Sequence, residues 1–206
     1  RFTRVILMKY PTTINNLIEC FKKLPGIGEK SAERMALSTM NFDEDILKLF
    51  SKSLLDVKTK IKRCKVCNNL AEDDLCEICK SSDRNSKVIC VVEEPKNVIL
   101  FEKVGTFHGL YHVLDGLISP LDNINPEDIN INQLIERIKS SDVEEVILAV
   151  KPSIEGETTA LYISKLLENS KVKVSKIAHG VPIGVDMEYI DALTLELALE
   201  DRTNIS

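Results

Sequence analysis

Four cysteines within sixteen residues constrain this chain more than any other feature of its sequence. They form two CxxC pairs, Cys64 with Cys67 and Cys76 with Cys79, with eight residues between the pairs. Four thiolates at this spacing can bind one zinc ion tetrahedrally, and no ligand position is left open for chemistry. Paired disulfides and an iron–sulfur cluster are the alternatives. We expect one structural zinc ion per chain, because we expect a reducing compartment.

The compartment is inferred from what surrounds the cysteines. Residues 1–7 are basic and apolar, but their apolar run is short and no small-residue cleavage site follows, so they do not read as a secretory signal. We expect them to be an extension or a misjudged start ahead of Met8. The longest apolar runs, 88–92 and 146–150, have five residues, whereas a membrane span needs about 20. We therefore expect a cytoplasmic protein without a membrane partner.

Charge is distributed unevenly along the chain. Residues 1–63 carry 13 Lys and Arg against 7 Asp and Glu, whereas residues 64–206 carry 14 against 25. The formal net charge of −5 argues against a general polyanion binder. The asymmetry suggests a basic contact surface in the first segment, with a solvated helix face as the alternative.

The first 63 residues read as a helical head. Apolar residues recur at three- to four-residue spacing from Ile14 to Leu24, a second helix follows over 30–39, and a third begins near Asp43 and runs to about residue 61. The same pattern places Cys20 among apolar residues, and Cys90 lies in an apolar run further on. We expect both to be ordinary buried thiols.

The turn between the first two helices carries the first candidate function. In Gly26-Ile27-Gly28 the glycines permit a tight turn, and the isoleucine can fill the space between the helices. The free N–H groups at the start of the next helix then face outward, which suits a phosphate. Lys30 and Arg34 are four residues apart, so they share one face of that helix.

This segment resembles a helix-hairpin-helix DNA-binding motif, which contacts the phosphate backbone and carries no base sequence. A plain connection between packed helices is the alternative. A nucleotide P-loop is excluded, because Glu29 stands where that motif needs glycine before Lys30. The candidate DNA-binding residues are Gly26, Ile27, Gly28, Lys30, Arg34, Lys22 and Lys23.

Strand and helix patterns alternate after the cysteine segment, which predicts an α/β unit with a largely parallel sheet. The expected strands are 88–92, 110–114, 146–150 and 172–178. The expected helices begin at Pro95 and span about 133–140, 156–167 and 188–200. The predicted fold is therefore a multi-part α+β chain: a helical head, a small four-cysteine zinc finger, an α/β domain and a C-terminal helix.

Acidic residues follow two of these strands, where sites form in open α/β sheets. Glu93 follows the first, and this placement resembles the Toprim domain of topoisomerases, primases and some nucleases. Its members pair such a glutamate with Asp-x-Asp to hold magnesium. Here Lys151 and Ser153 stand at the two aspartate positions, while Glu155 and Glu157 keep the rest of the pattern.

Replacing a carboxylate by a lysine exchanges a metal ligand for a positive charge. We therefore predict no catalytic residues, and we expect Glu93, Glu155 and Glu157 to be either solvated loop charge or a surface for a basic partner. A magnesium-dependent Toprim nuclease or primase-like enzyme remains the alternative.

His108 and His112 are four residues apart, but Gly109 and the β-type residues around them argue against a helical metal site. A packed or hydrogen-bonded histidine is expected instead.

The order of these parts, together with four further stretches, resembles the RecR family of bacterial recombination mediators. The resemblance runs from about Met8 to Arg202. Its domains fall at 8–63 for the helix-hairpin-helix head, 64–79 for the zinc finger, 87–182 for the Toprim domain and 183–206 for a segment that joins subunits. The stretches that carry it are 109–116, 118–121, 155–162 and 184–189.

The resemblance implies a non-enzymatic role in DNA repair and recombination. RecR proteins form dimer or tetramer rings that can encircle DNA, and they act with RecO and RecF to help load RecA on single-stranded gaps near the nucleoid. By motif match, Lys30 and Arg34 would face single- or double-stranded DNA without sequence preference, and the three Toprim acids would lie near RecO. An adaptor that never touches DNA is a third possibility.

Overall fold

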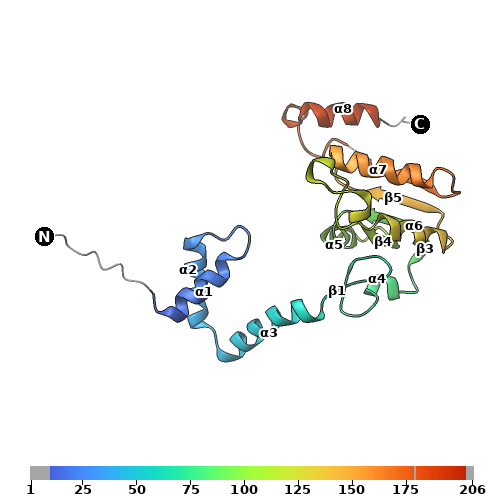
Figure 1. Cartoon of the computed structure of the whole chain (residues 1–206). Coiled ribbons are helices and arrows are strands. Elements are labelled where there is room, and N and C mark those ends of the chain that lie inside the picture. Colours follow the sequence, from blue (N-terminus) through green and yellow to red (C-terminus); the bar gives the residue numbers. More distant parts are fainter. Residues whose placement is uncertain (1–9, 179, 203–206) are drawn as a thin grey trace. The chain divides into compact units, whose positions relative to one another are not determined.

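The structure, a computed structural model, describes residues 10–178 and 180–202, so the expected extension at 1–7 lies outside the described residues. The chain forms two compact units, one up to Thr59 and one from Lys60 onward (Figure 1). Among the described residues, no helix has both the length and the apolar character needed to cross a membrane.

The first unit is helical, as predicted. It contains α1 (Thr12–Lys22), α2 (Glu29–Ser38), the short 3-10 turn η1 (Thr39–Asn41) and α3 (Glu44–Lys60). Its core is small and lies between α1 and α2, where Ile18, Ala32 and Ala36 are buried. The alanines let the two helix backbones approach closely. α3 has no buried side chain, although its apolar residues recur at helical spacing.

Cys20 corrects one prediction, because its side chain is exposed. The apolar stripe of α1 centres on Ile18, the buried residue of that helix. A helix turns about 100° per residue, so a residue two positions further points about 200° away, to solvent. The apolar neighbours of Cys20 in sequence therefore do not share its face.

The second unit begins with the cysteine segment. β1 (Lys62–Arg63) pairs antiparallel with β2 (Leu70–Ala71), and the one-turn helix α4 (Glu77–Lys80) follows. Three of the four cysteines are buried and form a cluster with Ala71. This is the small finger that the cysteine spacing predicts.

The body of the second unit contains a four-stranded, all-parallel sheet. Its order is β4-β3-β5-β6, which confirms the predicted parallel α/β arrangement. The helices between the strands are α5, α6 and α7, and two 3-10 turns, η2 and η3, precede α6. Their bounds are β3 (Asn85–Val92), α5 (Pro95–Val104), β4 (Gly109–Val113), η2 (Pro120–Asp122), η3 (Pro126–Asp128), α6 (Ile131–Lys139), β5 (Glu145–Ala149), α7 (Ile154–Leu167) and β6 (Lys173–Lys176).

Helices cover both faces of this sheet. Ile89 and Val91 of β3 face one side and join a core with residues of α6 and α7. Cys90 and Val92 face the other side and pack with Val98 of α5. Side chains along a strand alternate between faces, which is why one apolar run serves both layers. Burial of Cys90 agrees with the prediction, and it raises the pKa of that thiol to about 12.

The C-terminal helix starts later than predicted. A 3-10 turn, η4 (Met187–Tyr189), precedes α8 (Ala192–Glu200), where the sequence suggested one helix over 188–200. Asp191 sets the start, because its side chain accepts a hydrogen bond from the backbone N–H of Thr194 at 2.9 Å. An aspartate in this position caps the unpaired N–H groups of a helix.

Candidate metal centre and nucleic-acid interface

The four finger cysteines converge on one point. Their Sγ atoms all lie within 4.8 Å of one another, and the Sγ atoms of Cys67 and Cys76 are 3.5 Å apart. A tetrahedral zinc ion with bonds of about 2.3 Å holds its sulfur ligands about 3.8 Å apart. All four cysteines are free thiols. The arrangement fits zinc and does not contain the paired disulfides that the sequence left open.

Two local turns position the sulfur atoms. The Asn68 N–H donates to the carbonyl of Cys64 at 2.9 Å, and the Cys64 N–H donates to the carbonyl of Asn69 at 2.7 Å. Asn68 closes this turn in the left-handed region, at φ 59°, which asparagine adopts more readily than most residues. The second pair lies at the start of α4, where Cys76 is the residue before the helix.

The electrostatics of the cluster favour a thiolate. Hydrogen bonds, first from Cys67 and then from Cys79, hold the pKa of Cys76 well below its usual range. Zinc binds cysteine only as the thiolate, so metal binding must expel protons from the other sulfur atoms. The lowered pKa of Cys76 favours the thiolate form that zinc binds at this ligand.

The hairpin of the first unit has the predicted geometry. Gly26 adopts φ 79°, in the left-handed region, and Gly28 is the residue before α2. A Cβ atom on either glycine would meet no atom within 4 Å, so the turn is open to an approaching ligand. Ile27 is half-buried and packs on the core between α1 and α2. This agrees with its expected place between the helices.

The cations near this turn are not equivalent. Lys23, Lys30 and Arg34 are exposed. Lys22 instead forms ion pairs with Glu19 at 2.8 Å and Glu29 at 2.7 Å. Hydrogen bonds to Glu19 and then Glu29 raise the pKa of Lys22 above its usual range. The structure thus leaves three cations exposed for a phosphate backbone and holds the fourth against two acids.

The Toprim acids lie where the sequence suggested, but each has its own partner. Glu93 follows β3, and its Oε1 is 3.5 Å from Nζ of Lys151, which follows β5. Glu155 accepts a hydrogen bond from the Ser153 hydroxyl at 2.7 Å, and this bond lowers the pKa of Glu155. Lys151 thus provides a positive charge beside Glu93, at the carboxyl-end edge of the sheet.

Glu157 is the third of these acids, and Lys176 of β6 contacts both of its carboxylate oxygens at 3.1–3.2 Å. A hollow of about 310 Å³ beside Glu93 and Lys151 is otherwise mostly apolar, lined by Leu100, Val104 and Ile177. Within 10–178 and 180–202, only the four cysteines bring three or more potential metal ligands together. The three glutamates are not among such a group in these residues.

Comparison with known proteins covers 96% of the chain. Family models match residues 14–58 (RecR, helix-hairpin-helix), 61–81 (RecR, four-cysteine zinc finger domain), 87–178 (Toprim domain) and 180–203 (RecR, C-terminal). Proteins named Recombination protein RecR from Staphylococcus aureus strains JH9, JH1 and Mu3 are 50% identical over 198 residues, which is 96% of this chain and 100% of theirs.

The chain belongs to the RecR family. Membership agrees with the geometry of the cysteine cluster, because the matched finger model is of the four-cysteine type. The site binds one structural zinc ion, held by Cys64, Cys67, Cys76 and Cys79. The fold of this RecR chain is the predicted one, a helical head, a zinc finger, a Toprim domain and a C-terminal helix.

The two histidines of the Toprim domain do not form a metal site in this RecR chain. His108 is exposed, whereas His112 is buried in β4 with its Nε2 atom 2.9 Å from the carbonyl oxygen of Asn130. Burial lowers the pKa of His112 to about 4. This confirms the expected packed and hydrogen-bonded histidine.

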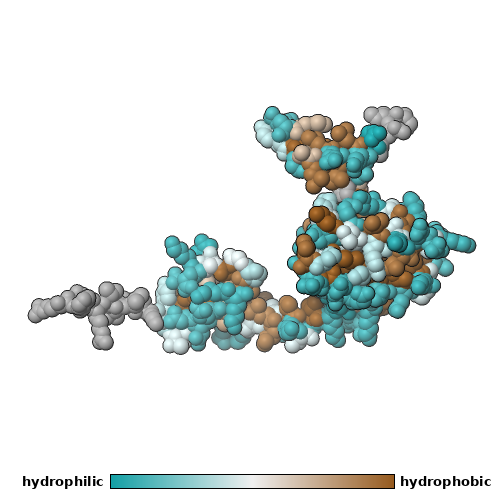
Figure 2. Space-filling model, turned by 45° about the horizontal axis from the view of Figure 1, so that its top comes forward, coloured by the Kyte–Doolittle hydropathy of each residue, from teal (hydrophilic) through white to brown (hydrophobic). Residues whose placement is uncertain are grey.

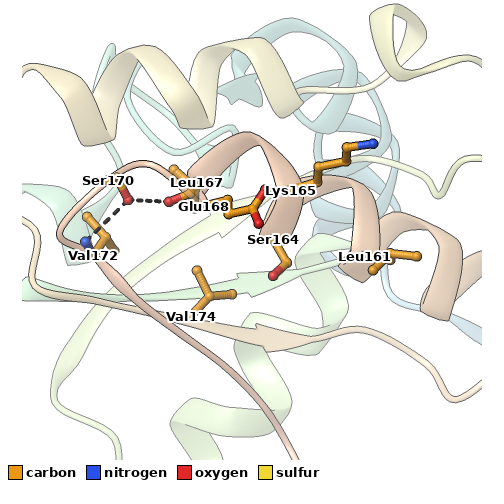
Figure 3. A pocket seen from close by; sticks show the side chains of 8 residues that line it. All are labelled: Leu161, Ser164, Lys165, Leu167, Glu168, Ser170, Val172 and Val174. Atoms are coloured by element: carbon orange, nitrogen blue, oxygen red, sulfur yellow. Dashed lines mark hydrogen bonds between the residues drawn. The ribbon is translucent and has the colours of Figure 1, made fainter.

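A second hollow, of about 480 Å³, lies between α7 and β6 (Figure 3). One of the polar side chains that line it, Ser170, stabilises a local turn. The Ser170 hydroxyl donates to the carbonyl of Leu167 at 2.6 Å and accepts from the N–H of Val172 at 3.2 Å. None of the predicted site residues lines it. We assign it no part in the function of this RecR chain.

Sequence reasoning missed three residues that shape these sites. Lys176 pairs with Glu157, Arg137 binds the backbone of β4, and Asn68 joins the finger to β4. The asparagine directly after a CxxC pair was the one available signal, because it suits a left-handed turn. The two cations have partners far away in sequence, so no local pattern marks them.

Proposed function

We propose that this RecR chain is a non-enzymatic mediator of DNA repair and recombination. It grips the DNA backbone through its helix-hairpin-helix head and acts with RecO- and RecF-type proteins to help load RecA on single-stranded gaps, in the bacterial cytoplasm at the nucleoid. The observation that carries the proposal is the pair Lys30 and Arg34, which are exposed one turn apart beside the open Gly26 and Gly28 turn.

The chemistry of this face explains why DNA is bound without sequence preference. Backbone N–H groups at the start of α2 and the two nearby cations recognise phosphates, which every sequence presents. Lys23 lies on the other side of the same turn. Single- and double-stranded DNA both offer such phosphates, so both are ligands of the head.

Assembly into a dimer or tetramer ring is supported by two exposed apolar surfaces (Figure 2). α3 exposes large apolar side chains along its length, and α8 does so within the predicted segment 183–206. Repeated heads in one ring add avidity without requiring a tight single site. The exposed apolar side chains are Ile46, Leu47, Leu49, Phe50, Leu54, Leu55 and Val57 on α3, and Leu193 and Leu199 on α8.

The Toprim acids supply the proposed contact for a RecO-type partner. Glu93, Glu155 and Glu157 lie at the carboxyl-end edge of the sheet, and Glu157 is about half exposed. Lys151 and Lys176 hold two of them now. The Lys176 pair with Glu157 is partly exposed, and such ion pairs are weak, while the Lys151 contact with Glu93 is long, at 3.5 Å. A basic partner can therefore exchange with these lysines.

Replacing the two cations tests the DNA-binding face. We expect Lys30→Gln with Arg34→Gln to weaken binding of a single-stranded oligonucleotide at least tenfold, because two phosphate contacts are lost in each head. Fluorescence anisotropy with oligonucleotides of two unrelated sequences measures this. The effect should be the same for both sequences.

The matched control removes two charges from the body of the protein. Lys139 and Lys171 are exposed, so Lys139→Gln with Lys171→Gln changes the net charge equally. This control should bind DNA within about twofold of the unchanged protein. A folded, zinc-loaded Lys30 and Arg34 variant with unchanged affinity would instead favour an adaptor that never touches DNA.

The absence of catalysis is tested separately. Lys151 lies 3.5 Å from Glu93, at the place where a Toprim enzyme needs a magnesium ligand. We expect no cleavage or extension of single- or double-stranded DNA in the presence of Mg²⁺, followed on denaturing gels. Cleavage that is lost in a Glu93→Gln variant would establish the enzyme instead.

A further inference from the structure

β4 is an edge strand of the Toprim sheet, and its outer edge needs partners. It pairs with β3 on one side only. In a strand of a parallel sheet, the backbone N–H and C=O of one residue point to the same side, and those of the next residue point to the other side. The outer edge of β4 therefore presents the backbone N–H and C=O groups of Tyr111 and Val113. Without hydrogen-bond partners, such groups can pair with a strand of another chain.

The zinc finger covers this edge at its carboxyl end. The N–H of Val113 donates to the carbonyl of Cys67, a zinc ligand, at 2.8 Å. Nδ2 of the next residue, Asn68, donates to the carbonyl of Val113 at 3.1 Å. One strand residue thus has both of its backbone groups bound by two consecutive finger residues. Arg137 of α6 covers the next position, where its Nη1 donates to the carbonyl of Tyr111 at 2.7 Å.

The turn that makes these contacts is the one that holds the first two zinc ligands. Asn68 is buried to 8% exposure, and its φ of 59° is set by the turn between Cys64 and Asn69. Nη1 of Arg63 donates to the carbonyl of Asn68 at 3.3 Å, and Nη2 of the same side chain lies 2.6 Å from Oδ1 of Asp115, just beyond β4. The finger is therefore fixed to the body at several points.

We propose that the zinc-bound turn of Cys64 to Asn68 acts as a cap on the β4 edge, so that zinc binding and order at this edge of the Toprim sheet are coupled. Asn68 is the positioning residue of this cap. Zinc holds the turn in the shape that presents the Cys67 carbonyl and the Asn68 amide together. By linkage, the contact with β4 strengthens zinc binding by the same factor that zinc strengthens the contact.

The cap gives the finger a role other than DNA binding. Its outer turn is acidic, with Glu72, Asp73 and Asp74 in sequence and Glu77 shortly after. Three of these acids form ion pairs within the finger, Asp74 with Lys65 and both Asp73 and Glu77 with Lys80. Lys65 and Lys80 therefore already have acidic partners and are not free cations for phosphates. Loss of zinc should release the β4 edge and promote association between chains through it. A finger that stabilised only itself would leave β4 unchanged.

Asn68→Gly tests the cap with zinc still bound. Glycine tolerates the left-handed φ, so the substitution removes the amide without straining the turn. We expect a chelator to remove zinc about tenfold faster, as when other groups that orient metal ligands are lost. We also expect the Val113 amide to exchange with solvent about five- to tenfold faster in residue-resolved NMR hydrogen exchange.

The structure supplies internal and external controls. The Leu114 amide bonds to the carbonyl of Val92, on the inner side of β4, so its exchange should not change. Asn123 also has a left-handed φ, of 57°, and lies outside the finger, so Asn123→Gly should release zinc at the unchanged rate. Asn68→Asp, which keeps the size but places a carboxylate against the Val113 carbonyl, should be at least as disruptive as Asn68→Gly.

Unchanged zinc release and unchanged Val113 protection in a folded Asn68→Gly protein would overturn the proposal. So would a zinc-free, folded protein in which the Val113 amide stays protected. The cap proposal does not require Asn68→Gly to bind DNA more weakly. The tests of the cap and of the proposed DNA-binding face are therefore independent of each other.

Discussion

His112 makes the stability of the body depend on pH. Its pKa is lowered from 6.5 to about 4 by burial, so the folded protein holds this imidazole neutral while the unfolded chain protonates it below pH 6.5. The stabilisation is complete above pH 6.5 and is lost as the pH falls toward 4. By linkage the loss amounts to about 3 kcal/mol.

His112→Gln tests this pH dependence. The glutamine amide can still donate to the Asn130 carbonyl, but it does not titrate. We expect the free energy of unfolding of the unchanged protein to fall more steeply between pH 7 and 5 than that of the variant, measured by denaturant titration in excess zinc. Protonation of the zinc ligands affects both proteins equally. Parallel curves would show that His112 does not titrate as described.

At the level of single residues, the sequence predicted the metal ligands but not the ion-pair partners. The cysteine spacing identified the four metal ligands, because two CxxC pairs can reach one ion from two short turns. It could not show that Lys176 binds Glu157, since that contact depends on where β6 lies beside β5. Exposure of Cys20 was missed because apolar neighbours in sequence were taken for neighbours in space.

At the level of elements, the apolar sequence of α3 disagrees with its exposed environment. It is 17 residues long and amphipathic, yet none of its side chains is buried. Such an apolar stripe needs a partner. A groove of about 460 Å³ between α3 and the neighbouring residues Leu17 and Thr39 adds to this apolar surface. These features make α3 a candidate contact between subunits.

Leu54→Gln with Leu55→Gln tests α3 as a subunit contact. Both leucines are more than 60% exposed, so the substitution costs the isolated chain little. We expect a smaller assembly by light scattering at matched concentration, because apolar surface that would be buried between chains has been made polar. Lys52→Gln on the same helix is the control and should leave the mass unchanged. An unchanged mass in the leucine variant would exclude α3 from the interface.

The strands and helices of the body were predictable because their apolar patterns are strong. The β-branched run 88–92 and the run 146–150 became neighbouring central strands, β3 and β5. The start of α8 was not predictable from apolar spacing, because Met187 and Tyr189 extend the apolar pattern of the helix to residues before its first turn. Only the Asp191 cap marks the true start.

At the level of the whole molecule, charge differs between the head, which is proposed to bind DNA, and the body, which is proposed to bind a protein partner. Residues 1–63 carry 13 cations against 7 acids, whereas the rest of the chain is acidic. On the proposed function, a basic head would attract DNA, and an acidic body would neither compete for it nor hold it tightly. The arrangement suits a mediator that binds DNA through many weak, salt-sensitive contacts.

The salt dependence of DNA binding tests the central claim most directly. The logarithm of the association constant for single-stranded DNA should fall linearly with the logarithm of salt concentration, with a contribution of about 0.7 per phosphate contact. In the Lys30→Gln and Arg34→Gln protein this slope should be shallower by about 1.4 per engaged head. A folded, zinc-loaded variant with the slope and affinity of the unchanged protein would contradict the account.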